Sequence, residues 1–90
     1  MAKHKKELAL YNGDFTSLAT ELGNLRYDAL AEFLHLLSEK LHQDGIADAN
    51  RGRVKLATQL QHASKSLEST ANAIEEAWRI CKPYMDAYEK

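Results

Sequence analysis

The chain has 90 residues, of which 44% are hydrophobic and 28% are charged, and its formal net charge is −1. The length indicates one domain, and the composition is that of an ordinary globular protein, which argues against disorder. The small net charge excludes a global field that would draw the whole chain to nucleic acid or to anionic lipid.

We expect no targeting or membrane segment in this sequence. Residues 1–6 are basic, but the apolar run at residues 8–11 is short and ends at the Asn12-Gly13 turn. No uninterrupted apolar stretch approaches the roughly 20 residues of a membrane span. Cys81 is the only cysteine, so no internal disulfide can form, and a cytoplasmic location is expected.

Sparse Gly and Pro and weak strand signals predict an all-α fold. Residues 1–13 should form an N-terminal segment or a short helix. The first long helix is predicted over about residues 15–43, or 14–43 with Asp14 as its N-cap. Gly23 can break this helix, and Asp44-Gly45 supplies its stop.

A second long helix is predicted over about residues 53–81, within outer limits of 47–82. Pro83 should end it, because the residue before a proline avoids helical dihedrals. Residues 83–90 then form a C-terminal turn. The short connection makes the two helices antiparallel neighbours, so residues 1–90 are predicted to be a single domain built on a helical hairpin.

The second helix carries a seven-residue apolar repeat, which is the spacing of a left-handed supercoiled seam. One track of this repeat is Leu60, Leu67, Ile74, Cys81 and Tyr88, and the other is Leu56, Ala63, Thr70, Ala77 and Tyr84. Trp78 and Ala71 flank the two tracks. The sequence therefore predicts that this seam packs against a neighbouring helix.

The first helix has a wider apolar face, spread over about half of its circumference. The residues of this face are Leu30, Phe33, Leu34, Leu36, Leu37 and Leu41. Because one antiparallel helix covers only one stripe, we expect two hairpins to pair as a homodimeric four-helix bundle. The alternative is a monomer whose terminal segments fold back over the first helix.

Two Glu-x-x-His pairs, Glu32/His35 and Glu39/His42, resemble the metal-binding pattern of carboxylate-bridged di-iron bundles. Here both pairs lie on one helix, and a helical wheel places them on its solvated side, away from Phe33. We therefore expect no metal and no cofactor. A surface metal site formed by His35, Glu39 and His42 stays open as an alternative, since imidazole and carboxylate suit Zn²⁺.

A basic ridge on the second helix offers another alternative, because cations in a row can meet phosphates. The ridge consists of Arg51, Lys55, His62 and Lys65, with Arg53 close by. It is short, it lacks interleaved aromatics, and the net charge is slightly negative. Nucleic-acid binding is therefore not the expected function.

No combination of nucleophile, base and oxyanion donors predicts an enzyme. Cys81 lies on the predicted seam and reads as a small core residue. A C-terminal cluster of Trp78, Tyr84, Met85 and Tyr88 is suited to contact another chain or to cap the hairpin. We expect a non-enzymatic protein that acts through protein–protein contact as an adaptor, regulator or assembly subunit; the sequence identifies neither partner nor process.

The layout resembles that of small secreted hairpin dimers whose turn carries Trp-x-Gly. The turn here reads Gln43-Asp44-Gly45-Ile46, and the only tryptophan is Trp78, deep in the second helix. No function of that family is therefore carried over to this chain.

Overall fold

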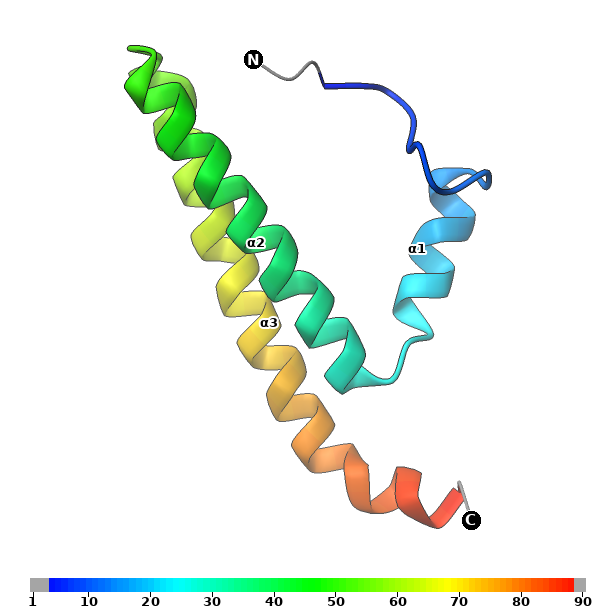
Figure 1. Cartoon of the computed structure of the whole chain (residues 1–90). Coiled ribbons are helices and arrows are strands. Elements are labelled where there is room, and N and C mark those ends of the chain that lie inside the picture. The colour runs from blue at the N-terminus through cyan, green and yellow to red at the C-terminus, as the bar shows by residue number, and fades with distance from the viewer. Residues whose placement is uncertain (1–3, 89–90) are drawn as a thin grey trace.

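The computed structural model describes residues 4–88, with side chains described as far as Tyr84, and every regular element in this range is a helix. The helices are α1 (Phe15–Gly23), α2 (Tyr27–Asn50) and α3 (Val54–Tyr88). Figure 1 shows α2 and α3 side by side as an antiparallel hairpin, with α1 diverging from them. The all-α prediction is confirmed, whereas the predicted first long helix is in fact two helices.

Local hydrogen bonds define both ends of α1. The Asp14 carboxylate accepts a hydrogen bond from the backbone N–H of Ser17 at 2.8 Å, which makes it the predicted N-cap. Gly23 ends α1, and the N–H of Asn24 bonds back to the carbonyl of Thr20 at 3.0 Å. Residues 4–14 form no helix, so the described part of the N-terminal region is a segment.

The predicted stop at Asp44-Gly45 is wrong, since α2 continues to Asn50. Gly45 is buried inside the helix, and a Cβ atom there would fall against the side-chain amide of Gln61 on α3. The glycine therefore permits a close approach between helices instead of ending one. Asp44 is held within the helix by an ion pair with Lys40 at 2.6 Å, one turn away.

The turn between α2 and α3 depends on Gly52, whose φ of +80° lies in the left-handed region. We expect Gly52→Ala to lower the free energy of unfolding by about 1–2 kcal/mol, because a Cβ atom is strained in that conformation. Gly23→Ala is the matched control, since nothing lies within 4 Å of a Cβ atom there. Urea denaturation of both variants at one protein concentration measures the difference. Equal stabilities would contradict the assignment of Gly52 as a required glycine.

The predicted end of the second helix at Pro83 is also wrong, because α3 runs through Pro83 to Tyr88. A proline inside a helix removes one N–H donor, and its ring crowds the carbonyl four residues earlier, so the helix bends instead of ending. Figure 1 shows the last turns of α3 veering from the line of the hairpin. Residues 89–90, the end of the predicted C-terminal turn, lie outside the described residues.

The molecule is long and thin, with principal extents of 53 × 29 × 15 Å. Its Cα radius of gyration is 16.1 Å, against about 12 Å for a compact domain of this length. The buried apolar residues within the described range are Ala31, Ala57 and Ala71, and no large side chain there is fully buried. The hairpin therefore has the thickness of one helical layer and no conventional core.

Candidate interaction surface

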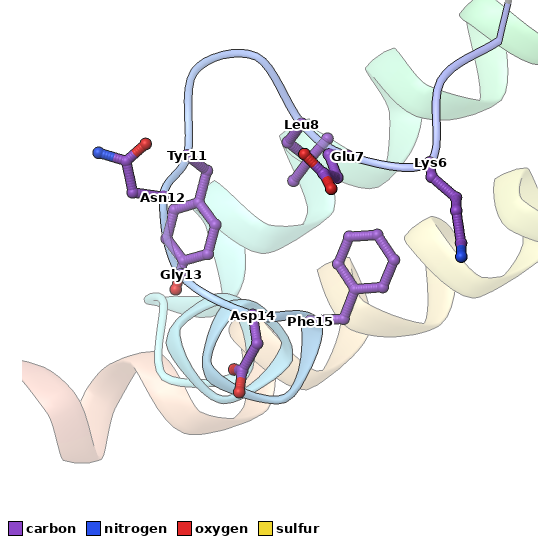
Figure 2. Close-up of a pocket in the computed structure, with 8 residues that line it drawn as sticks. All are labelled: Lys6, Glu7, Leu8, Tyr11, Asn12, Gly13, Asp14 and Phe15. Carbon is purple, nitrogen blue, oxygen red and sulfur yellow. The ribbon is translucent and has the colours of Figure 1, made fainter.

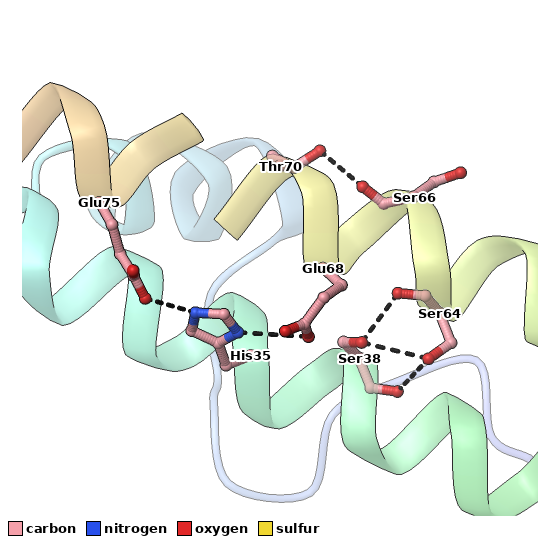
Figure 3. Close-up of polar contacts among 7 residues, drawn as sticks. All are labelled: His35, Ser38, Ser64, Ser66, Glu68, Thr70 and Glu75. Atoms are coloured by element: carbon pink, nitrogen blue, oxygen red, sulfur yellow. Dashed lines mark hydrogen bonds and ion pairs between the residues drawn. The ribbon is translucent and has the colours of Figure 1, made fainter. Parts of the chain in front are cut away.

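Small side chains form the contact between α2 and α3, which we call the small-residue seam. Its buried members are Ala31, Ser38 and Gly45 of α2 and Ala57, Ser64 and Ala71 of α3, each set spaced by seven residues. The hydroxyl of Ser38 donates to the backbone carbonyl of Ser64 at 2.8 Å, and the hydroxyl of Ser64 donates to the carbonyl of Ser38 at 2.8 Å (Figure 3). Each hydroxyl reaches the opposite backbone, so the two helices lie unusually close.

The residues of α3 that contact α2 most closely are not those of the seven-residue repeat predicted on the second helix. The residues facing α2 are Ala57, Ser64 and Ala71, whereas the two predicted tracks lie to one side of them. Leu60 and Leu67 are half-buried, Leu56 is 47% exposed, and Thr70 is exposed. The predicted repeat is therefore real in the sequence, but α2 covers it only in part.

Large apolar side chains of both helices gather on one side of the seam, and we call this surface the apolar face. It comprises Leu30, Leu34, Leu37 and Leu41 of α2 and Leu56, Leu60, Leu67 and Ile74 of α3. A turn of 100° per residue puts both rows on the same side of two antiparallel helices. Leu37 stays 37% exposed, and the other three leucines of α2 on this face are half-buried. Leu36, which lies outside this face, is 63% exposed.

The area of exposed surface is large for a chain of this mass. The accessible surface is 7276 Å², whereas a folded monomer of 10.2 kDa exposes about 5,300 Å². The excess of roughly 2,000 Å² is more than twice the area of about 800 Å² that each partner buries in a standard interface.

The opposite side of the hairpin, here called the polar side, carries the polar contacts between α2 and α3. His35 is half-buried there, so its predicted solvated position is wrong. Its Nε2 lies 2.5 Å from a carboxylate oxygen of Glu75, and its Nδ1 lies 3.3 Å from one of Glu68 (Figure 3). His42 also faces α3, with Nδ1 2.6 Å from the amide oxygen of Gln61. His42 is exposed, as predicted, whereas the helical wheel misplaced His35 because the small-residue seam moves the contact line toward it.

These contacts give His35 a definite electrostatic role. Hydrogen bonding to Glu75 and then to Glu68 raises the pKa of His35 above its ordinary value of 6.5. The doubly protonated ring can donate to both carboxylates, whereas the neutral ring has one N–H. The charged form therefore joins α2 to two positions on α3 that lie two helical turns apart.

We expect this link to make stability depend on pH in one direction. Because the folded pKa is raised, the stabilisation is fully present below about pH 6.5 and is lost as the pH rises through the folded pKa. His35→Gln should flatten the fall in the urea midpoint across this window, measured at fixed protein concentration. His62→Gln, on an exposed part of α3, is the control and should keep the parent's profile.

The residues of the alternative metal site do not converge. Glu32 and Glu39 are exposed, and Glu39 accepts a hydrogen bond from Gln43 at 2.9 Å, while both ring nitrogens of His35 meet carboxylates of α3. In the described part of the chain, no group of three or more His, Cys, Asp or Glu side chains is placed to hold a metal ion.

A buried carboxylate pairs with two arginines of the predicted basic ridge. Asp48 is 7% exposed and lies 3.6 Å from the guanidinium of Arg51 and 3.3 Å from that of Arg53. These two arginines therefore fasten the turn after α2. Lys55, His62 and Lys65 are exposed on α3.

The C-terminal aromatic cluster is only partly assembled. Trp78 is half-buried, and the guanidinium of Arg26 stacks 5.2 Å from its ring centre. Tyr84 is 69% exposed, and Cys81 is half-buried. The side chains of Met85 and Tyr88 lie outside the described ones. Trp78 therefore contacts the joint between α1 and α2 through Arg26.

A shallow hollow lies between the N-terminal segment and the start of α1 (Figure 2). It is lined by residues 6–8 and 11–15, which are neighbours in the sequence. Tyr11 closes one side and donates a hydrogen bond to Glu21 at 2.6 Å. The hollow is thus a local fold of this segment, with no residue from the hairpin.

Comparison with protein-family models, curated proteins and solved structures finds no match for this chain. Within the described residues, no helix combines the length and the apolar character that crossing a bilayer requires. The apolar face is therefore the feature on which a proposal of function can be built.

Proposed function

We propose that this chain is a non-enzymatic helical protein that acts through protein–protein contact, as an adaptor, a regulator or an assembly subunit. Its working form in this proposal is a homodimer in which two hairpins meet through their apolar faces. The observation that carries the proposal is the incomplete burial of two leucine-rich rows on the same side of one hairpin. Pairing two such layers gives a four-helix bundle with a core of ordinary thickness.

A second copy suits this surface better than the chain's own remaining segments. The nine residues of α1 form one helix about 14 Å long, whereas the apolar face is two helices wide and runs about 27 Å along α3 from Leu56 to Ile74. One α1 helix can therefore cover less than half of the apolar face. A second hairpin matches its length and its two-row pattern, and the excess exposed area is sufficient for a stable symmetric interface.

Sedimentation equilibrium over a concentration series tests the homodimer. We expect a mass of twice 10.2 kDa from low micromolar to several hundred micromolar concentrations. A single-chain mass throughout the series would overturn the homodimer. Small-angle scattering on the same samples should give a particle thicker than the 15 Å extent of one chain.

A further inference from the structure

The first helix is well formed but makes little contact with the hairpin, and its Leu18 and Leu22 side chains are only half-buried. Its apolar stripe consists of Phe15, Leu18 and Leu22, spaced by three and four residues. Phe15 is 63% exposed, and α1 buries no residue, in contrast to the extensive contact between α2 and α3. A helix of nine residues is marginal by itself, so its apolar stripe needs a surface to pack on.

The joint after α1 leaves the hairpin on the side of the apolar face. The Arg26 guanidinium binds Asp28 through two hydrogen bonds, at 2.7 and 2.8 Å, and also stacks on Trp78. A depression beside this joint is lined by residues 23–27 together with Trp78 and Cys81, which continue the apolar side of α3. In Figure 3, where the His35 side is toward the viewer, the pale blue ribbon of α1 passes behind the hairpin.

The segment before α1 is tied to it by hydrogen bonds. The Tyr11 hydroxyl binds the Glu21 carboxylate, and Asp14 caps the helix, so residues 11–23 are tied together. Leu8 and Leu10 are 48% and 100% exposed on the same segment. The unit therefore presents apolar side chains while standing clear of its own hairpin.

We infer that α1 is an exchanged arm, which packs its Phe15, Leu18 and Leu22 stripe against the hairpin of the partner copy. The inference rests on the proposed homodimer. When a second hairpin covers the apolar face, its helices occupy the side on which α1 stands, and the stripe meets them. The joint at residues 24–26 is short: Asn24 and Leu25 bond back to α1, and Arg26 stacks on Trp78 of α3, which limits how far α1 can turn toward its own hairpin.

Isotope-filtered NMR on the full chain tests the exchange. Labelled (¹³C) and unlabelled chains are unfolded together, refolded as an equal mixture and confirmed as dimers by mass. We expect filtered NOEs from the Leu18 and Leu22 methyl groups of labelled chains to α2 and α3 protons of unlabelled chains. Methyl NOEs confined to one chain, or none to either hairpin, would overturn the exchange and leave the homodimer standing. A single-chain mass would overturn both.

A double variant adds an energetic readout. Leu18→Ser with Leu22→Ser should raise the dimer dissociation constant at least tenfold, because the stripe would lose its buried area. Thr16→Ala with Thr20→Ala, on the other side of α1, should leave that constant within a factor of about three. An equal effect of the two pairs would contradict a role for the stripe in the interface.

Discussion

Replacing Leu37 and Leu56 with glutamate should convert the dimer into a monomer while the hairpin keeps its helical structure. Both side chains lie on the apolar face and are already 37% and 47% exposed in one chain, so a charge there leaves the hairpin's own contact largely intact. Each leucine loses about 1 kcal/mol of burial, because only its remaining exposed part is covered in the dimer, and each glutamate adds the cost of burying a carboxylate. Two-fold symmetry counts every substitution twice. The dissociation constant should therefore rise at least about 100-fold.

The matched control for this experiment is Ile46→Glu. Ile46 is 42% exposed on α2, but it lies on the polar side of the hairpin, near His42. It should leave the mass in sedimentation equilibrium unchanged, and circular dichroism should show equal helix content in all variants. Dissociation by Ile46→Glu equal to that by the double variant would show that apolar character in general, and not this face, holds the chains together.

Replacing Ser38 with leucine should be among the most damaging single substitutions in the hairpin. Ser38 is 4% exposed, and its hydroxyl bonds to the opposite backbone at 2.8 Å, so a larger side chain must force the helices apart. The cost combines overpacking with a lost buried hydrogen bond and should reach about 3 kcal/mol. The melting temperature should fall by more than about 10 °C at fixed protein concentration.

Two other variants define the cause of this loss. Ser66→Leu, at an exposed position on α3, should change the free energy of unfolding by less than about 0.5 kcal/mol. Ser38→Ala removes the hydrogen bond without adding volume and should cost about 1 kcal/mol. A Ser38→Leu variant as stable as Ser38→Ala would mean that the backbones are not closely packed at this point.

The sequence was sufficient for the parts of the fold that depend on local chemistry. Asp14 as N-cap, a break at Gly23 and the antiparallel pairing of two amphipathic helices all follow from residue type and spacing. The helix ends predicted at Gly45 and Pro83 were wrong because glycine and proline disfavour helix in general but do not end every helix that contains them. Close packing against Gln61 explains the helical Gly45, and a bend accommodates Pro83.

The side chains around the seam were harder to place. The search for large apolar residues at seven-residue spacing found Leu60 and Leu67 but passed over the equally regular Ala57, Ser64 and Ala71. The same spacing in Ala31, Ser38 and Gly45 was the available signal for a close contact. The error moved the inferred contact line around each helix, which placed His35 in solvent and hid its partners on α3.

The small-residue seam has a consequence for how the hairpin selects its alignment. Its members recur every seven residues on both helices, so sliding one helix by two turns would again place small residues opposite one another. The repeat of small residues by itself therefore does not define a single alignment of the two helices. The three-residue turn between α2 and α3, held by Asp48 and its two arginines, is too short to permit that slide. Connection length therefore excludes the shifted alignments, and the polar contacts of Ser38 and His35 with α3 favour the same alignment.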